Sequence, residues 1–248
     1  MPRTAVVFGA TKGIGRALAR QMAARGDRLF LLGRHREDLQ RSASDLDVYG
    51  GSTPTQFALC DLERPDSFAP ALDEAERAIG GRIDVIVVTA ALFATQADLE
   101  ADLHLTERLL AANFTNTIMF CEHARRRLLA SGGGTLCVFS SVAGERGRKP
   151  VILYGATKAG LTRYLEGLDH KFFAQGLRVV CVKPGFVRTS MTSGLPEPPF
   201  AADADHVAAD ALRAIDRGTP VVYTPRVWAL VMAVIRRLPR SIMRSVGF

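Results

Sequence analysis

Residues 9–15 read Gly9-Ala10-Thr11-Lys12-Gly13-Ile14-Gly15 and directly follow a short apolar run, Ala5 to Phe8. Apolar side chains recur at helical spacing from Gly15 to Arg25, so the seven residues form a turn between a strand and a helix. Glycines there let the backbone approach a ligand closely, and the helix start offers free N–H groups and a partial positive charge. At the first strand of a chain, such a turn predicts a site for a dinucleotide pyrophosphate, although a tight turn alone also favours glycine.

Short apolar runs and longer helical patterns alternate along the rest of the chain, without an internal repeat or a linker. Near-continuous apolar strands are typical of a parallel sheet that is buried on both faces. The pattern predicts one α/β domain over residues 1–224, with a doubly wound parallel sheet of about seven strands. The expected strands are Ala5 to Phe8, Arg28 to Leu32, Thr55 to Leu59, Ile83 to Thr89, Thr135 to Phe139, Leu177 to Val182 and Pro220 to Tyr223.

The composition is that of an ordinary globular protein, with 248 residues of which 48% are apolar and 23% charged. It excludes collagen-like, disordered and disulfide-scaffold proteins. The cysteines Cys60, Cys121, Cys137 and Cys181 are widely spaced beside apolar residues, which predicts buried thiols rather than disulfides or a metal site. The first apolar run is too short for a signal peptide, and no apolar stretch approaches the roughly 18 residues that cross a bilayer, so we expect a cytoplasmic protein.

The end of the second expected strand indicates which dinucleotide is bound. Folds that prefer NAD usually have an acid there that binds the ribose 2′-OH, whereas this chain has Gly33-Arg34-His35-Arg36. Arg34, together with Lys12 from the glycine turn, would instead meet a 2′-phosphate, which predicts NADP(H) over NAD(H). The alternative is that these arginines are solvated residues at a helix start. Asp61 and Leu62 follow the third strand, where the carboxylate would accept a bond from the adenine amino group or cap a helix.

Tyr154 and Lys158 lie four residues apart, which places a phenol and an ammonium on one face of the helix after the fifth strand. A tyrosine with its ordinary pKa of about 10 transfers protons poorly at neutral pH, and a neighbouring cation favours its phenolate. Ser141 lies at the carboxyl end of the fifth strand, where ligands bind in open α/β sheets, and its hydroxyl could bond a substrate carbonyl oxygen. The three residues together predict proton transfer to a carbonyl group.

These residues resemble the classical short-chain dehydrogenase/reductase family, and the resemblance extends over residues 1–224. The matching segments are Gly9 to Gly15, Asp61-Leu62, Asn113, Ser140-Ser141-Val142-Ala143-Gly144, Tyr154 to Lys158 and Pro184-Gly185-Phe186-Val187-Arg188-Thr189. The resemblance implies a Rossmann-type fold, a nicotinamide cofactor and a homo-oligomer.

The resemblance also implies a role for each matching residue. Tyr154 would be the general acid, Lys158 would bind the nicotinamide ribose and lower the pKa of the tyrosine, and Ser141 would orient the substrate. Asn113 would hold the water that links Lys158 to solvent. The cofactor would also contact residues after the fourth and sixth strands, namely Ala90, Pro184, Gly185, Val187 and Thr189.

One segment departs from the family pattern. Where the family usually has Asn-Asn-Ala-Gly after the fourth strand, this chain has Thr89-Ala90-Ala91-Leu92. The two amide side chains that normally brace the central sheet are absent, so we expect the wall of the cofactor pocket to be braced differently. A catalytically silent dinucleotide sensor or scaffold would have lost the tyrosine or the lysine, and neither is lost here.

The loop between Ser141 and Tyr154 is basic. Its side chains Arg146, Arg148 and Lys149 would clamp a phosphate or diphosphate of the substrate, or would form a solvated loop with no ligand. The segments Ala143 to Arg146 and Pro239 to Ile242 resemble one subfamily, the actinobacterial decaprenylphosphoryl 2-keto-ribose reductases. That resemblance implies a lipid-linked keto-sugar as substrate and a role in cell-wall biosynthesis; a 3-oxoacyl compound or another lipid ketone is the alternative.

The net charge of +7 is concentrated in the C-terminal segment, residues 225–248, which contains five arginines and no acid. The remainder of the chain has 27 basic and 25 acidic residues and is nearly neutral. Apolar residues from Val227 to Ile235, Trp228 among them, precede most of these arginines, a composition that suits a helix at the surface of an anionic membrane. The alternative is that the segment packs on the body or in a subunit interface. Nucleic acid is not an expected partner, because aromatic residues are not interleaved with the arginines.

The Pro-rich stretch Ser193 to Phe200 cannot form a regular element and is long enough to be a lid. Its part from Pro196 to Phe200, together with the C-terminal segment, would form an apolar entrance for a lipid-linked substrate. The sequence therefore predicts an NADPH-dependent ketoreductase with a Rossmann domain, a C-terminal amphipathic helical extension and a peripheral contact with the cytoplasmic face of a membrane.

Overall fold

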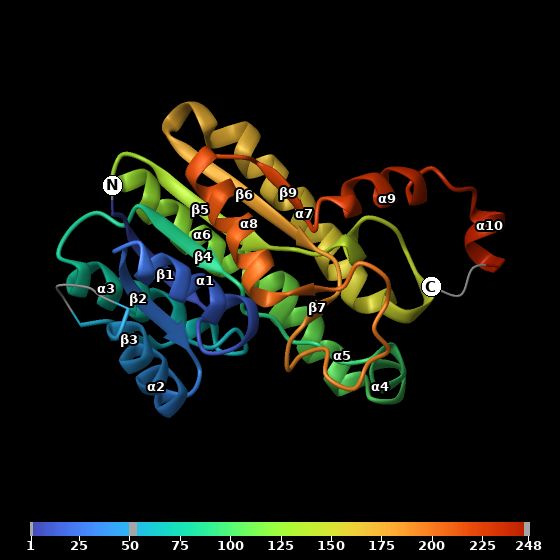
Figure 1. The fold of residues 1–248 in the computed structure, drawn as a ribbon, viewed down its shortest axis with the longest axis horizontal. Coiled ribbons are helices and arrows are strands. Elements are labelled where there is room, and N and C mark those ends of the chain that lie inside the picture. The colour runs from blue at the N-terminus through green and yellow to red at the C-terminus, as the bar shows by residue number, and fades with distance from the viewer. Residues whose placement is uncertain (1, 50–53, 246–248) are drawn as a thin grey trace.

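A computed structural model describes residues 2–49 and 54–245 of the chain (Figure 1). Its main sheet has seven parallel strands in the order β3-β2-β1-β4-β5-β6-β9. The strands are β1 (Thr4–Phe8), β2 (Arg28–Gly33), β3 (Gln56–Leu59), β4 (Val85–Val88), β5 (Gly134–Phe139), β6 (Leu177–Pro184) and β9 (Val221–Thr224). The strand order reverses between β1 and β4, so the predicted doubly wound Rossmann-type fold is confirmed.

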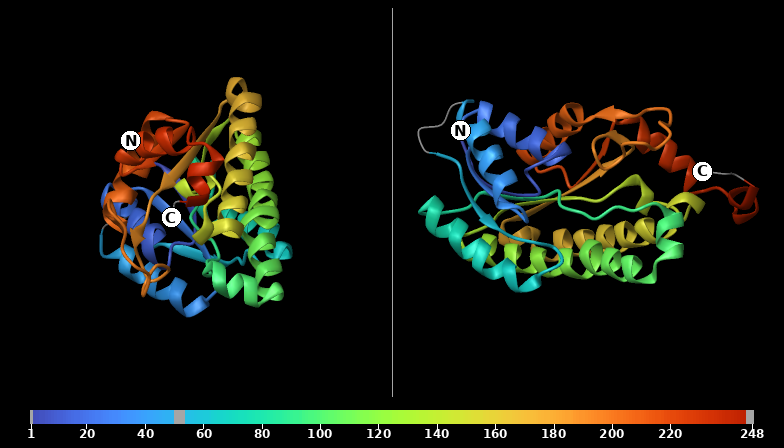
Figure 2. Two further views of the ribbon diagram at one scale, coloured as in Figure 1. Left: turned by 90° about the vertical axis from the view of Figure 1, so that its right-hand side faces the viewer. Right: turned by 90° about the horizontal axis from the view of Figure 1, so that it is seen from below.

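Helices cover both faces of the sheet (Figure 2). One layer contains α1 (Gly13–Ala24), α2 (Arg36–Asp47) and α8 (Ala204–Arg217), and the other contains α3 (Phe68–Ile79), α6 (Thr117–Ala130) and α7 (Ile152–Phe172). Successive residues of a strand face opposite layers, so Val6 and Phe8 join one apolar cluster while Ala5 and Val7 join the other. This is why the central strands are apolar at nearly every position. All four cysteines are buried, as predicted.

Shorter elements lie near the carboxyl ends of the strands. They include α4 (Gln96–Ala101), α5 (Leu103–Leu110), a π-helical turn η2 (Ala111–Asn116), a 3-10 turn η3 (Val142–Gly144) and a second, two-stranded sheet of β7 (Val187–Arg188) and β8 (Ala202–Asp203). The stretch Ser193 to Phe200 between β7 and β8 is irregular, as its prolines predict. Arg188 of β7 forms an ion pair with Glu197 of this loop, at 2.5 Å.

The C-terminal segment forms two helices, α9 (Val227–Ile235) and α10 (Arg240–Ser245), at one end of the molecule (Figure 1). The inner face of α9 is apolar, and Trp228, Met232 and Ile235 pack with Val142 in a separate buried cluster. Its outer face exposes Leu230 and Val234. None of the helices in the described part of the chain combines the length and the apolar character needed to span a bilayer.

Candidate active site

The site is built where β5 and α7 meet. The chain leaves β5 at Phe139, and the Ser141 hydroxyl accepts a hydrogen bond from the Ala143 N–H, at 3.0 Å, and so caps the η3 turn. The turn then packs on α7 so closely that only glycine fits at the contact. A Cβ on Gly144 would lie 2.7 Å from the Ala159 nitrogen, and one on Gly155 would lie 2.8 Å from the Ala143 oxygen. The backbone contact therefore fixes Ser141 relative to Tyr154 and Lys158.

Lys158 is buried beneath this contact, with 3% of its surface exposed. Its Nζ donates a hydrogen bond to the Phe139 carbonyl at 3.0 Å and lies 5.6 Å from the centre of the Tyr154 ring. Burial lowers the pKa of Lys158 to about 8, because the charged form loses its hydration. The ammonium is thus charged at neutral pH and loses its charge as the pH rises through about 8.

Tyr154 lies in the first turn of α7, and its ring packs edge-to-face on Phe93, with 5.4 Å between the ring centres. Burial raises the pKa of Tyr154 to about 12, and the Ser141 hydroxyl acts in the opposite direction. At neutral pH the side chain is therefore a phenol that can donate its proton. The lowering of this pKa by Lys158, which the family resemblance implies, stays a prediction for the site with its cofactor bound.

Asn113 belongs to the π-helical turn η2, and 1% of its surface is exposed. Its amide makes two hydrogen bonds with the backbone of Leu92: Oδ1 accepts from the N–H at 2.7 Å and Nδ2 donates to the carbonyl at 2.6 Å. The side chain thus braces the loop after β4. Its expected role in holding a water next to Lys158 stays a prediction.

The loop after β4 is also braced from β1, which resolves the departure from the family pattern. Thr89 donates its hydroxyl to the carbonyls of Phe8 and Gly9, at 3.0 and 3.1 Å. The hydroxyl of Thr89, directly after β4, and the amide of Asn113 therefore brace this loop in place of the two missing amides. Ala90, the expected cofactor contact, lies against the glycine turn, because a Cβ on Gly9 would come within 2.7 Å of its nitrogen.

The glycine turn fits a pyrophosphate. Gly9 has a φ of +95°, and a Cβ on Gly15 would lie 2.2 Å from the Gly9 oxygen, so the chain can turn this tightly only with glycine. Helix α1 begins at Gly13 with no side-chain cap and no acid in its first turn. Its first N–H groups, next to Thr11 and Ile14, are therefore available to an anion.

The two cations predicted to meet a 2′-phosphate lie just beyond the paired ends of β1 and β2. Lys12 and Arg34 have side chains that are 67% and 54% exposed. Each has a carboxylate nearby, Asp38 at 3.6 Å from Lys12 and Glu63 at 3.8 Å from Arg34. The sequence prediction missed these two acids, which a 2′-phosphate would have to displace or share.

Asp61 and Leu62 follow β3 as predicted, but both take part in local structure. The Asp61 carboxylate accepts a hydrogen bond from the Glu63 N–H at 3.1 Å, and Leu62 is buried. Asp61 does not cap the helical turn that follows, whose N-cap is Arg64 without a side-chain bond, and its contact with an adenine amino group stays a prediction.

The segment after β6 forms the opposite wall of the site. Thr189 lies over the start of α1, 3.2 Å from the position of a Cβ on Gly13, and Val187 is buried in β7. Gly185 is covered by the C-terminal helix, because a Cβ there would lie 2.0 Å from the Trp228 Nε1. Pro184 ends β6 directly before it.

Trp228 packs on the body of the protein, as the alternative for the C-terminal segment predicted, and a membrane contact of the rest of the segment stays a prediction. Its indole is buried against Gly185, and Phe200 of the Pro-rich loop packs on it edge-to-face at 6.2 Å between ring centres. The apolar residues of α9 therefore lie on two faces of the helix. Trp228 packs inward against Gly185 in the wall of the candidate cofactor site, and Leu230 is exposed on the outer face.

The basic loop after η3 does not present a free phosphate clamp. Arg146 donates to the Leu238 carbonyl at 2.8 Å, and Lys149 donates to the Arg244 carbonyl at 2.7 Å. Arg148 is partly buried, its Nε has no hydrogen-bond partner among the described residues, and burial lowers the pKa of its guanidinium. Two of the three predicted substrate ligands therefore bind the main chain of the C-terminal segment, although Lys149 itself is exposed, and binding of a substrate phosphate by this loop stays a prediction.

A buried ion-pair network next to this loop was not predicted. Glu145 pairs with Lys183 of β6 at 2.6 Å, both side chains being less than a tenth exposed, and with Arg236 after α9 at 3.1 Å. The sequence did contain a signal for this network, because Lys183 lies in an otherwise apolar strand and a buried charge there needs a partner of opposite charge. The network joins the Ser141 turn, the Gly185 wall and the C-terminal segment.

Comparison with known proteins identifies the class. The family model for short chain dehydrogenases matches residues 3–199, so the chain belongs to the short-chain dehydrogenase/reductase family, and it is an oxidoreductase of that family. An uncharacterized oxidoreductase of Mycobacterium tuberculosis is 32% identical over 97% of this chain and 96% of its own. One of Streptomyces coelicolor is 32% identical over 99% and 96%. A solved short-chain dehydrogenase/reductase of Mycobacterium ulcerans superposes with a TM-score of 0.79 at 23% identity, covering 89% and 87% of the two chains.

The family uses nicotinamide dinucleotides, and the glycine turn, Lys12, Arg34 and the wall from Pro184 to Thr189 are the residues that would hold one here. The M. tuberculosis and S. coelicolor relatives match nearly the full length of the chain and therefore include its C-terminal segment. The human 3-oxoacyl-[acyl-carrier-protein] reductase, by contrast, is 29% identical over 79% of this chain and 81% of its own.

Proposed function

We propose that this protein is an NADPH-dependent ketoreductase whose substrate is an amphiphilic ketone, and that a polyprenyl-phosphate keto-sugar of the decaprenylphosphoryl 2-keto-ribose type is the preferred candidate. The observation that carries the reductase assignment is the arrangement of Ser141, Tyr154 and Lys158 around one backbone contact between η3 and α7. A silent sensor would have no use for a buried lysine and a protonated tyrosine held in this way.

The side chains would act as follows. A bound nicotinamide dinucleotide supplies the hydride that reduces the carbonyl carbon. Tyr154 donates its phenolic proton to the carbonyl oxygen, and the Ser141 hydroxyl donates a hydrogen bond to the same oxygen as negative charge develops there. Lys158 holds its positive charge beneath the phenol and stabilises the phenolate that remains after proton transfer.

The choice of an amphiphilic substrate is supported by the C-terminal segment. Trp228 and Phe200 place aromatic surface beside the Gly185 wall, and α9 continues outward from there with Leu230 and Val234 exposed. A long apolar chain on the substrate could lie along this surface while the keto group reaches Tyr154. A 3-oxoacyl thioester is the second candidate, because the human relative matched over 79% of this chain is named as a 3-oxoacyl reductase.

The catalytic part of the proposal is tested by Tyr154→Phe, which removes only the acidic hydroxyl. We expect a loss of turnover of about 10²- to 10⁴-fold with unchanged NADPH binding, measured by quenching of protein fluorescence. Tyr164→Phe removes the same hydroxyl from the same helix, where it donates to Glu122 rather than facing the site, and serves as the matched control. Retained turnover in Tyr154→Phe would refute the assignment.

The substrate and cofactor are tested with the wild-type protein. Turnover is compared between a polyprenyl-phosphate keto-ribose, a 3-oxoacyl thioester and a short water-soluble ketone, each with NADPH and with NADH. The proposal requires the amphiphilic compounds to have the highest kcat/KM and NADPH to have the lower KM. Replacement Arg34→Asp should reverse the cofactor preference, and a wild-type preference for NADH would refute the NADPH assignment.

A further inference from the structure

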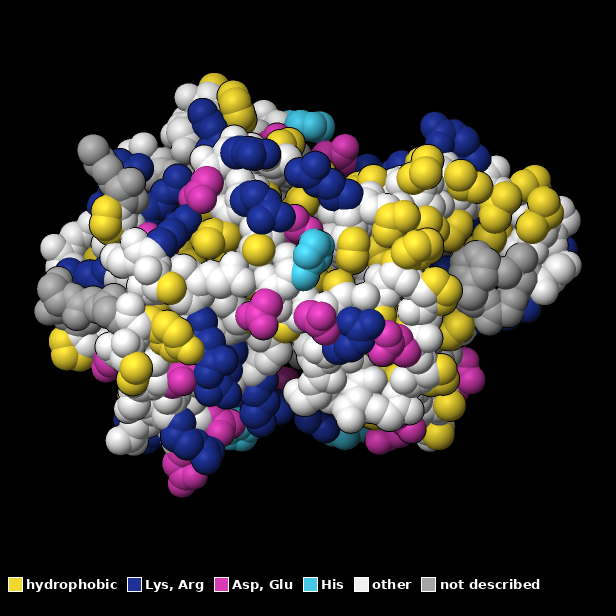
Figure 3. All heavy atoms as spheres, in the orientation of Figure 1, with side chains coloured by type: hydrophobic (Ala, Val, Ile, Leu, Met, Phe, Trp, Pro, Cys, Tyr) yellow, Lys and Arg dark blue, Asp and Glu magenta, His cyan; other side chains and the backbone are white. Residues whose placement is uncertain are grey.

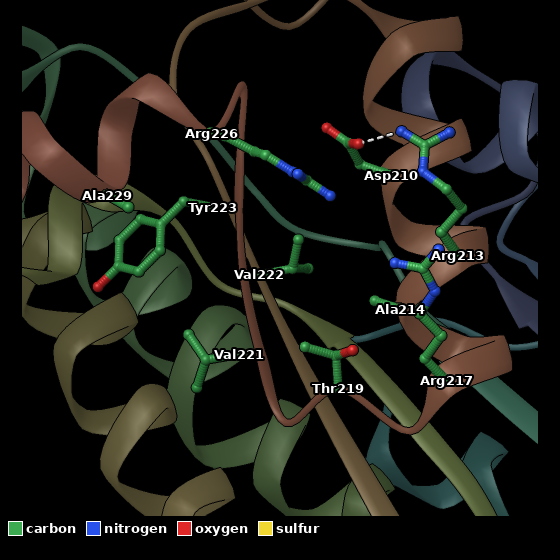
Figure 4. Close-up of a pocket in the computed structure, with 10 residues that line it drawn as sticks. All are labelled: Asp210, Arg213, Ala214, Arg217, Thr219, Val221, Val222, Tyr223, Arg226 and Ala229. Atoms are coloured by element: carbon green, nitrogen blue, oxygen red, sulfur yellow. Dashed lines mark hydrogen bonds and ion pairs between the residues drawn. The ribbon is translucent and has the colours of Figure 1, made fainter.

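A groove lies along the free edge of the main sheet, between α8 and the start of α9 (Figure 4). It has a volume of about 300 Å3, and none of Ser141, Tyr154 or Lys158 lines it. Its floor is the outer strand β9, with Val221 and Val222, and its walls are α8 on one side and the first residues of the C-terminal segment on the other. No part of the proposed reaction uses this groove.

Three arginines from two separate elements line the groove. Arg213 and Arg217 lie four residues apart on one face of α8, and Arg226 extends from the end of β9 toward them (Figure 4). All three are exposed, and a space-filling view shows Lys and Arg side chains gathered over α8 beside the apolar surface of α9 (Figure 3). Like charges repel, so this arrangement costs stability unless an anion joins them.

The one acid in the lining pairs with only one of these three cations. Asp210 is 6% exposed, accepts a hydrogen bond from the Thr224 hydroxyl at 2.6 Å and pairs with Arg213, and its Oδ2 lies 3.4 Å from His206. Its oxygens are therefore already in use. Arg217 and Arg226 have no ion pair and no side-chain hydrogen bond with any residue that the structure describes. Two guanidinium groups thus remain available at a groove of about the right size for a small anion.

We propose that this groove binds a phosphate group, carried either by an anionic lipid headgroup or by a free phosphate ester. The guanidinium fork matches phosphate oxygens in geometry and charge, and Arg217 and Arg226 would bind the group from opposite walls while Arg213 stays with Asp210. Val221 and Val222 would contact the carbon part of the ester, and the exposed Leu230 lies one helical turn beyond Arg226. A second copy of the chain is a poor occupant, because a two-fold contact would face six guanidinium groups against one another.

The experiment compares wild type with Arg217→Gln/Arg226→Gln, and with Arg77→Gln/Arg126→Gln as the control of equal charge. Arg77 on α3 and Arg126 on α6 are exposed in the opposite helix layer. Saturating NADPH is present throughout, so that the cofactor turn cannot bind the probe. One arm measures the rise in Tm with inorganic phosphate, and the other measures co-sedimentation with phosphatidylcholine vesicles with or without phosphatidylglycerol.

We expect the groove variant to bind its probe about tenfold more weakly for each arginine removed, and the control variant to match wild type. A loss confined to the vesicle arm identifies a lipid headgroup, and a loss in the phosphate arm identifies a free phosphate ester. The proposal is overturned if wild type responds to neither probe, or if both variants lose binding equally. A dimer in sedimentation velocity that only the groove variant weakens would also overturn it, by placing a second copy there. Ketone reduction is unaffected in each case, so this test is independent of the proposed activity.

Discussion

At the scale of single residues, the burial of Lys158 sets a pH range for the reaction. Its pKa is lowered to about 8, while that of Tyr154 is raised to about 12. We therefore expect kcat/KM for ketone reduction to fall as the pH rises through about 8, because the lysine loses its charge while the tyrosine keeps its proton. Initial rates at low substrate concentration between about pH 6 and 10 measure this, and a flat profile would contradict it.

The lowered pKa of Lys158 also changes the free energy of unfolding with pH, so stability measurements test the pKa independently of catalysis. In the unfolded chain Lys158 keeps its ordinary pKa of 10.5, so between about 8 and 10.5 the unfolded state binds more protons than the folded state. This term therefore raises the free energy of unfolding as the pH rises through that window. The difference in unfolding free energy between wild type and Lys158→Met should rise over the same range in urea titrations.

Gly185 is the residue at which the C-terminal segment meets the cofactor wall most closely. Gly185→Ala should destabilise the protein by about 1–3 kcal/mol, because the new Cβ would lie 2.0 Å from the Trp228 Nε1. The double variant Gly185→Ala/Trp228→Leu removes the collision and should be less destabilised than the sum of the two single changes. Gly167→Ala, at an exposed helical position with no atom within 4 Å of the new Cβ, should stabilise and serves as the control.

How much the sequence predicts depends on whether a residue acts through its neighbours in the chain. The glycine turn, Ser141, and the Tyr154–Lys158 spacing are local patterns, and each lies where its pattern places it. Arg146 could not be predicted in the same way, because its partner is the Leu238 carbonyl, 92 residues away. The chemistry of a side chain determines which groups it can bind, but only the fold determines whether another part of the protein already occupies it.

At the scale of elements, the ion-pair network of Glu145, Lys183 and Arg236 holds η3, β6 and α9 together. Glu145→Gln should destabilise the protein by about 3–5 kcal/mol, because it leaves the Lys183 ammonium buried without a counter-ion. Urea unfolding measures the change, and Lys183→Met in the same background should recover part of the loss. Glu166→Gln, which breaks the exposed pair with Arg163 on α7, should cost less than about 1 kcal/mol.

The strands were predictable to within one or two residues, because apolar runs record burial on both faces of a parallel sheet. The π-helical turn η2 and the small β7–β8 sheet were not, since neither has a periodic sequence signal. For helix α9 the sequence predicted the helix itself but not the orientation of its faces. Its composition indicates a helix with apolar surface to spare, but composition does not say which face packs on Val142 and which faces water.

At the scale of the whole molecule, helices α9 and α10 form one end of the protein, where the outer face of α9 exposes Leu230 and Val234 (Figures 1 and 3). If this end contacts a membrane, Leu230→Gln/Val234→Gln should weaken co-sedimentation with vesicles of phosphatidylcholine and phosphatidylglycerol by about tenfold or more, since each side chain loses apolar burial. The matched control is Val48→Gln/Leu103→Gln, two residues that are 83% and 79% exposed elsewhere. Equal binding by all three proteins would exclude α9 as the contact.

The loop after η3 holds the C-terminal segment by its main chain. Arg146 and Lys149 bind the carbonyl oxygens of Leu238 and Arg244, and every amino acid presents such an oxygen. Side chains in the segment can therefore be exchanged without loss of these anchors. If the segment lines the substrate entrance, as proposed, point substitutions in it would change that lining while the entrance and the catalytic residues keep their positions.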